Sequence, residues 1–311
     1  MMNPLSQLYQ FGVQVDRAMT RQRELKRPVL SVGNIAMGGR AKTPLTIRIA
    51  QEMKKRGTTP VVLTRGYGRK RSQDIWLDPS TPNFEFSTEE TGDEPIEIFL
   101  KAGCFVLVGA NRYENGRRFL KRFTRLPNVM FLLDDGFQHW SLKRDVDICV
   151  IESFDRSASV FPVGNLRECV QGLERADIVL ELGKDILKKS KFLKAPQKME
   201  HALALTTRAV NSEYRKFLTQ NLDNCQLVEL KDHAGSDAML TVIRERKPSE
   251  LILGFKEAVK LLKWSELKRL SAEGRLDISF EGRPLEIYVV DCEIEIAEEE
   301  DFWIKVFECL Y

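Results

Sequence analysis

The sequence lacks the cysteine patterns that mark a zinc site or a disulfide scaffold. Its six cysteines form no Cys-x-x-Cys pair, and no cluster of histidine and cysteine has the spacing of zinc ligands. We therefore expect reduced thiols in a cytosolic protein. Long apolar runs are also scarce, since the longest, residues 104–110, is far shorter than the roughly 20 residues that a membrane span requires. No signal peptide is expected, because no basic start followed by an apolar stretch is present.

Neither sign of charge dominates the chain. Its 48 lysines and arginines against 45 acidic residues give a net charge of +3, which is no signature of nucleic-acid binding. With 311 residues, 43% of them hydrophobic and 30% charged, the chain is neither a disordered tail nor a fibre. This length predicts about two globular domains.

Short apolar runs alternate with helical patterns along the first half of the chain. Strands are predicted at residues 28–33, 60–64, 104–109, 129–133 and 146–151. Helices are predicted between them, at residues 44–56 and 111–125. This alternation predicts an α/β fold with a parallel sheet.

The second half repeats this rhythm less clearly. Strands are predicted at residues 177–182, 202–205, 226–230, 250–254 and 283–296, and helices at residues 256–270 and 298–310. The join is expected near residues 161–165, Phe-Pro-Val-Gly-Asn. It separates a core over residues 28–162 from a smaller α/β domain over residues 163–311.

Residues 1–27 read as an amphipathic helix that precedes the core. Apolar residues recur in it at helical spacing, and basic residues gather toward its end: Arg17, Arg21, Arg23, Lys26 and Arg27. A basic amphipathic helix can lie on an anionic membrane surface. An ordinary surface helix also collects basic residues near its carboxyl end, where the helix dipole favours them. The pattern leaves both interpretations open.

Residues 33–44, Gly-Asn-Ile-Ala-Met-Gly-Gly-Arg-Ala-Lys-Thr-Pro, follow a predicted strand and open a predicted helix. This is the setting of a phosphate-binding loop, whose backbone N–H groups bind phosphate oxygens. Lys42 would reach the outer phosphates, and the Thr43 hydroxyl would bind Mg²⁺. Ala36 and Ala41 occupy the two glycine positions of the usual pattern, so a glycine-rich turn without a ligand remains the alternative.

Two acidic motifs stand where phosphoryl transfer needs them. Asp134 and Asp135 follow the strand predicted at residues 129–133, where a Mg²⁺ partner is expected, although Asp-Asp-Gly is also a common turn. Asp93 and Glu94 open a helical stretch and suit either a general base or a helix cap. Together with the loop, the order of these motifs favours a nucleotide-dependent phosphotransferase.

Six strings of the chain resemble the tetraacyldisaccharide 4′-kinase family in order and spacing, from about residue 5 to residue 170. They are SVGNIAMGGRAKTP, LTRGYGRK, TGDEP, LLDDGFQH, RDVDICVIE and FPVGNLRE. Beyond them the match thins to residues 231–233 and 256–260. The resemblance implies a P-loop NTPase-like core with a parallel sheet and a smaller α/β second domain, with the substrate in the cleft between them.

The resemblance also implies an activity and a location. The γ-phosphate of ATP would pass, with Mg²⁺, to the 4′-hydroxyl of a tetraacylated glucosamine disaccharide 1-phosphate and give lipid IVA. A peripheral protein on the cytoplasmic face of the bacterial inner membrane is implied as well. This setting favours the membrane interpretation of residues 1–27, and no nucleic-acid partner is expected.

Roles for single residues follow from the same resemblance. Asp93 is implied as the catalytic base and His233 as its partner. The nucleotide-binding loop would comprise Gly38, Gly39, Arg40, Ala41, Lys42 and Thr43. The metal would be held by Thr43, Asp134 and Asp135. Further candidates are Arg65, Gln138, His139 and Glu168.

The chain departs from the family pattern in its loop. Arg40 and Ala41 stand where the family usually has threonine and glycine. The Ala41 methyl group is expected to crowd the phosphates, unless Arg40 compensates with its positive charge. Two other functions therefore stay open. One is a catalytically weakened nucleotide-binding protein of the same fold, and the other is a soluble P-loop enzyme that acts on small carboxylates or metal-delivery partners.

Overall fold

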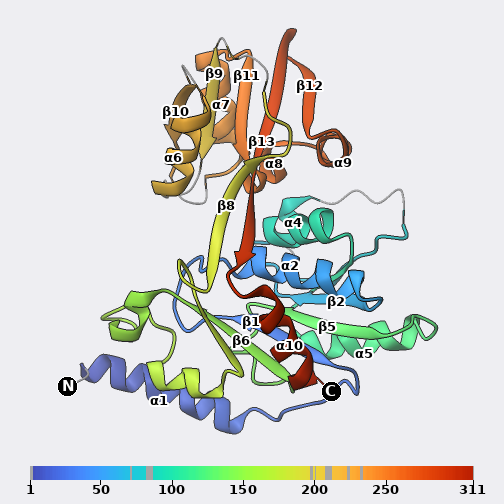
Figure 1. Ribbon diagram of the computed structural model, residues 1–311, viewed down its shortest axis with the longest axis vertical. Coiled ribbons are helices and arrows are strands. Elements are labelled where there is room, and N and C mark those ends of the chain that lie inside the picture. The colour runs from blue at the N-terminus through green and yellow to red at the C-terminus, as the bar shows by residue number, and fades with distance from the viewer. Residues whose placement is uncertain are drawn as a thin grey trace.

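The chain folds into two β-sheets that carry helices, as seen in a computed structural model (Figure 1). The structure describes residues 3–70, 72–81, 87–196, 199, 201–206, 212–222, 225–231 and 234–310. We call the part built on the first sheet the first lobe and the part built on the second sheet the second lobe.

The first sheet has the strand order β3-β4-β2-β5-β1-β6-β7. Its strands are β1 (Val29–Gly33), β2 (Thr59–Thr64), β3 (Ile75–Leu77), β4 (Phe105–Val108), β5 (Val129–Asp134), β6 (Val146–Ile151) and β7 (Ile178–Glu181). Neighbouring strands run parallel, except that β3 is antiparallel to β4 at one edge. The five strands predicted in the first half are confirmed.

Helices cover both faces of the first sheet. They are α1 (Pro4–Met19), α2 (Lys42–Lys55), α3 (Thr88–Thr91), α4 (Asp93–Ala102) and α5 (Arg112–Arg122). Because successive strand residues point to opposite faces, Val62 packs in the cluster that contains α2 and α4. Its neighbour Val61 packs with Phe119 of α5 on the other face. Burial on both faces explains why these strands read as continuous apolar runs.

The second sheet has the order β10-β9-β11-β13-β12, and β8 pairs with β13. Its strands are β8 (Ile186–Phe192), β9 (Ala202–Thr206), β10 (Cys225–Glu229), β11 (Glu250–Gly254), β12 (Arg275–Phe280) and β13 (Arg283–Ile296). The later helices are α6 (Ser212–Asn221), α7 (Ser236–Arg246), α8 (Phe255–Leu261), α9 (Trp264–Glu273) and α10 (Glu299–Leu310). Figure 1 shows β8 and β13 running together from the second lobe to the first.

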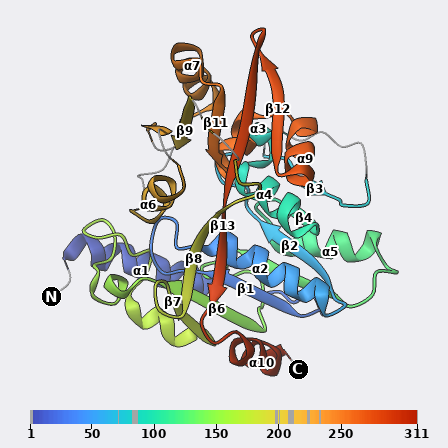
Figure 2. The same cartoon turned by 45° about the horizontal axis from the view of Figure 1, so that its top comes forward.

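Both ends of the second half return to the first lobe. β7 pairs in parallel with β6, so the first sheet extends past the boundary predicted at residues 162–163. Figure 2 shows α10 beside β6, below the β8–β13 ribbon. There the Arg48 guanidinium of α2 lies 5.5 Å from the Trp303 ring centre and pairs with Glu299. The second lobe is therefore inserted between β7 and α10.

Two helix predictions are corrected by the structure. The helix expected over residues 1–27 ends at Met19, because Arg23 instead pairs through its backbone with Ser141 and Lys143. The helix expected over residues 256–270 is broken into α8 and α9 at Lys263, whose N–H donates to the Glu266 carboxylate. In the part of the chain that the structure describes, no helix is both long and apolar enough to cross a bilayer.

Candidate active site

The loop between β1 and α2 opens at the carboxyl edge of the first sheet. Since β1, β2, β5 and β6 are parallel, the segments that follow them meet at this edge, where α/β proteins bind ligands. Lys42 folds back over the loop, and its Nζ lies 3.2 Å from the Gly38 carbonyl oxygen and 3.3 Å from Asp135 Oδ1. The loop and the acidic pair are thus brought together as the sequence predicts.

Ala41 and Arg40, the two residues that depart from the family's loop pattern, have an unusual backbone conformation and a buried ion pair, respectively. Ala41 caps α2 in the left-handed region, with φ 57° and ψ 20°, a conformation that costs a non-glycine residue about 1–2 kcal/mol. The Arg40 guanidinium donates to Asp155 at 2.9 and 3.1 Å and lies 3.3 Å from Glu152. Two carboxylates neutralise its charge, which corrects the expectation that Arg40 offers a positive charge to the phosphates.

Asp134 ends β5 and is almost fully buried. Its Oδ1 accepts from the Thr46 hydroxyl at 3.1 Å, and its Oδ2 accepts from the Thr64 hydroxyl at 3.4 Å. Burial, together with the negative charges of Glu94 and Asp135, raises the pKa of Asp134 to about 7. A buried carboxylate with so much negative charge around it suits a cation.

These donors fit Mg²⁺ rather than an all-protein metal cage. Among the described residues there is no group of three or more His, Cys, Asp or Glu side chains that could hold a metal by themselves. Mg²⁺ is commonly held by one or two carboxylates with phosphate oxygens and waters completing its shell. Asp134 and Asp135 would supply the carboxylates, and the buried Thr43 follows Lys42 at the start of α2.

Arg167 holds Asp135 in place, and the sequence did not single it out. One Arg167 nitrogen, Nη1, lies 3.0 Å from each Asp135 carboxylate oxygen. Although burial raises the pKa of Asp135, Lys42 and Arg167 outweigh it and hold that pKa below its usual value. Asp135 is therefore a carboxylate at neutral pH. The only signal for Arg167 was its place in the FPVGNLRE string.

Gln138 and Glu168 act from behind the site. Gln138 Nε2 donates to the Asn34 carbonyl oxygen and to Glu168 Oε1, both at 2.8 Å. Glu168 is buried and also pairs with Arg175 at 2.8 Å. These bonds connect the beginning of the phosphate loop to the segment after β5. Gln138 and Glu168 therefore support the structure of the loop.

His139 is a neutral imidazole in an arginine-rich corner. Its Nδ1 lies 3.2 Å from Arg112 Nη1, and because a guanidinium only donates, Nε2 carries the proton and donates to Ser141 Oγ at 3.1 Å. Burial, followed by the charges of Arg112, Arg144 and Arg65, lowers the pKa of His139 to about 3. His139 is thus no acid at neutral pH, and Arg65 is exposed after β2 at the same edge.

Asp93 and Glu94 begin α4 and face two neighbours. Glu94 is close enough to Asp134 to raise its pKa, so the structure brings both acidic motifs together. On the other side, Lys260 Nζ lies 3.7 Å from Asp93 Oδ2 and Lys256 Nζ lies 2.5 Å from Glu94 Oε1. His233 lies outside the described residues, so its pairing with Asp93 stays a prediction.

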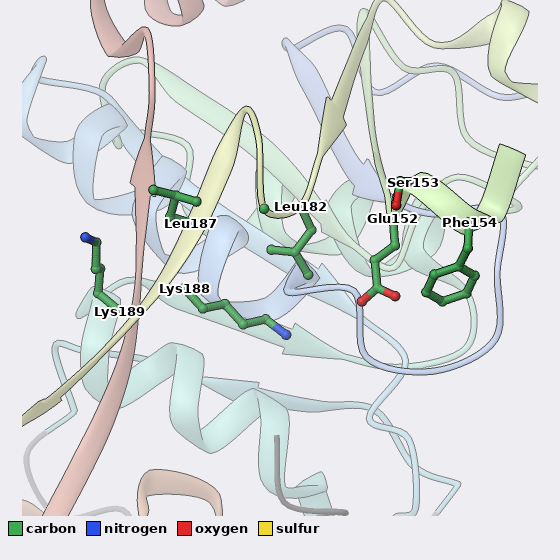
Figure 3. A pocket seen from close by; sticks show the side chains of 8 residues that line it. Glu152, Ser153, Phe154, Leu182, Leu187, Lys188 and Lys189 are labelled. Carbon is green, nitrogen blue, oxygen red and sulfur yellow. The ribbon is translucent and has the colours of Figure 1, made fainter. Parts of the chain in front are cut away.

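A cavity of about 470 Å³ lies between the segment that follows β6 and the start of β8 (Figure 3). Its apolar walls include Phe154, Leu182 and Leu187. Figure 3 shows Glu152 and Lys188 extending toward each other from opposite sides of this space. Arg40 of the phosphate loop contacts one wall of the cavity, because its guanidinium carbon lies 4.9 Å from the Phe154 ring centre.

Comparisons with known proteins agree with this geometry. The model of the family LpxK, tetraacyldisaccharide-1-P 4′-kinase, matches residues 1–235. The tetraacyldisaccharide 4′-kinase of Koribacter versatilis (strain Ellin345) is 41% identical over 196 residues, or 58% of this chain and 57% of that one. That of Desulfotalea psychrophila is 32% identical over 208 residues, or 64% and 59%. The chain thus spans under two thirds of the length of these relatives.

A solved structure matches over almost the whole chain. LpxK from Aquifex aeolicus, in complex with ATP, superimposes with a TM-score of 0.75 at 24% identity. The match covers 99% of this chain and 98% of that one. It confirms the predicted fold class, a P-loop α/β core with a second α/β part.

Proposed function

Because the chain belongs to the tetraacyldisaccharide-1-P 4′-kinase family, we propose that it phosphorylates the 4′-hydroxyl of a tetraacylated glucosamine disaccharide 1-phosphate and forms lipid IVA. ATP is the phosphate donor, in line with the ATP complex of the Aquifex aeolicus protein. The observation that carries the proposal is the meeting of three sequence motifs at one sheet edge. Lys42, Asp134 and Glu94 come from distant segments and interact electrostatically there.

Each of these groups has a task in the transfer. The loop N–H groups and Lys42 bind the outer phosphates. Thr43, Asp134 and Asp135 would hold Mg²⁺, which neutralises phosphate charge when bound. Asp93 accepts the proton of the 4′-hydroxyl while that oxygen bonds to the γ-phosphorus, and the bond from phosphorus to the ADP oxygen breaks. Asp93 is accessible for this role, because its side chain is 22% exposed.

The cavity of Figure 3 is the place we assign to the adenine. Phe154 and Leu187 offer apolar walls for a flat base, and Glu152 offers acceptors for its amino group. Arg40 of the loop contacts Phe154 of this cavity, which supports a nucleotide with its phosphates on the loop and its base in the cavity.

We further propose that α1 lies on the cytoplasmic face of the inner membrane, where the lipid substrate is anchored. Ser6 donates to the Val160 carbonyl oxygen and Gln10 contacts Cys169, so one side of α1 is fixed to the first lobe. The other side exposes an apolar stripe, which consists of Leu5, Leu8, Phe11, Val15 and Met19. An exposed apolar stripe on an amphipathic helix supports docking to a lipid surface.

Transfer of radiolabelled phosphate from ATP to the lipid disaccharide tests the activity. Asp93→Asn should lower kcat about 10²–10⁴-fold, the usual worth of a general base, while calorimetry shows ATP binding nearly unchanged. Lys42→Ala should instead weaken ATP binding. Asp237→Asn is the matched control, because Asp237 is an exposed first-turn acid of α7. A wild-type protein that binds ATP without transferring phosphate would support a catalytically weakened protein instead.

A further inference from the structure

Two lysines of the second lobe lie against the acids that begin α4. Lys256 and Lys260 are four residues apart, so they project from one face of α8. α8 packs along α4, as Figure 1 shows. Lys256 Nζ lies 2.5 Å from Glu94 Oε1, and Lys260 Nζ lies 3.7 Å from Asp93 Oδ2.

Both pairs are partly shielded from water. The side chains of Lys260 and Asp93 are 19% and 22% exposed, and those of Lys256 and Glu94 are 20% and 33% exposed. Salt screens shielded ion pairs less than surface pairs, so the attraction between these side chains is stronger than in an exposed pair. An aromatic contact also joins the two lobes here: the ring centres of Phe99 on α4 and Trp264 on α9 are 5.9 Å apart.

The two acids have different surroundings. Asp93 Oδ1 accepts the Glu94 backbone N–H at 3.0 Å, and Oδ2 forms an ion pair with Lys260, so the two carboxylate oxygens have different partners. Glu94 instead lies near enough to Asp134 for its negative charge to act on that carboxyl group. Lys256 balances the charge of Glu94. The lysines therefore act on two different parts of the site.

We propose that Lys260 is a positioning residue that orients the Asp93 carboxylate, and that Lys256 neutralises Glu94 beside the metal and phosphate site. The site is then complete only when the second lobe is docked on α4. This inference rests on the proposed role of Asp93 as the base.

The two lysines should differ in kinetics. Lys260→Met should lower kcat about tenfold with little change in the KM for ATP, because a misplaced catalytic group slows the chemical step. Lys260→Arg should recover most of the rate, since it restores a cation near Oδ2. Lys256→Met should mainly raise the KM for ATP, because an unbalanced Glu94 repels the phosphates. Lys216→Met, an exposed lysine of α6, is the control.

A double-mutant cycle separates positioning from other roles. If Lys260 acts through Asp93, Lys260→Met combined with Asp93→Asn loses no more activity than Asp93→Asn alone. Losses that multiply, or an arginine variant no better than the methionine one, would overturn the positioning role. An active Asp93→Asn enzyme refutes the base and the positioning role together. An inactive Asp93→Asn beside a wild-type-like Lys260→Met refutes the positioning role alone. Circular dichroism, with Lys260→Gln as a second neutral variant, excludes misfolding as the cause.

Discussion

Arg40 shows how a residue of the phosphate loop can connect that loop to a buried carboxylate elsewhere in the fold. Asp155 is fully buried, and its carboxylate accepts both the Arg40 guanidinium and the Glu152 backbone N–H. The pair fastens the phosphate loop to the segment after β6. A threonine at position 40, which the family pattern usually has, would leave Asp155 without this cation.

Replacing Arg40 should therefore reduce stability. Arg40→Met should lower the free energy of unfolding by about 3–5 kcal/mol, because it leaves a buried charge without its partner. Urea denaturation measures this loss. Asp155→Asn added to Arg40→Met should restore much of it.

The matched control is Arg244→Met. Arg244 pairs with Glu281 at 2.8 Å, but both side chains are about half exposed. An exposed pair contributes at most about 1 kcal/mol. Equal losses from the two arginine variants would contradict the structural importance of the buried pair.

At the scale of elements, α1 combines a fixed side and an exposed side. Its buried contacts attach it to residues 160–169, and its apolar stripe faces away from them. The basic residues after Met19 are not helical, and they continue along the first lobe through the backbone pairing of Arg23. The Arg23 guanidinium carbon lies 5.2 Å from the Tyr113 ring centre, so this cation packs on the first lobe.

The apolar stripe can be tested without disturbing the fold. Leu8→Glu with Phe11→Glu should weaken binding to anionic vesicles on the order of a hundredfold, since each buried apolar side chain contributes about 1.5–3 kcal/mol. The fold should hold, because both side chains are more than 60% exposed. Vesicle sedimentation measures the binding.

Gln7→Glu with Gln14→Glu adds the same charge at exposed positions that lie outside the arc of the stripe. This control should retain most of the vesicle binding. If both double variants pellet equally with vesicles, α1 is only part of the scaffold.

At the scale of the whole molecule, the lobes share one core and one buried ion network. A single hydrophobic cluster contains Leu30 of the first sheet and Leu251 of the second. Lys101 of α4 pairs with Asp291 of β13 and with Glu97. Burial by itself lowers the pKa of Lys101, but these carboxylates raise it above the usual value, so Lys101 stays charged.

Removing the cation of this network should loosen the lobes. Lys101→Met leaves the buried Glu97 and Asp291 without a cation, so we expect a loss of about 3–5 kcal/mol. Hydrogen exchange should increase in α4 and β13 first, and β5 should stay protected. Lys189→Met is the control, because Lys189 and Glu295 on the same ribbon are both more than half exposed. Exchange that rises evenly over the chain would argue against a role between the lobes.

The sequence by itself determined the core of the first lobe and its motifs. Strands such as β5 are buried on both faces, so each appears in the sequence as a continuous apolar run. The phosphate loop and the Asp-Asp-Gly turn are contiguous motifs, so they too can be identified from the sequence. The ends of α1 and α8 were misplaced, because backbone pairing at Arg23 and the cap at Glu266 decided them. β8 and β12 were missed, since both depend on pairing with β13.

Only the tertiary structure decided which groups meet across the chain. Arg167 reaches Asp135 from 32 positions away, and Lys260 reaches Asp93 from the other lobe. Neither pairing leaves a local pattern, because a salt bridge across a fold depends on how strands and helices stack rather than on sequence spacing. Arg40 was likewise assigned to the phosphates from its position in the loop, whereas packing turned its side chain to Asp155. The contiguous motifs contain the reactive groups of the proposed site. Packing between distant segments determines how those groups are oriented.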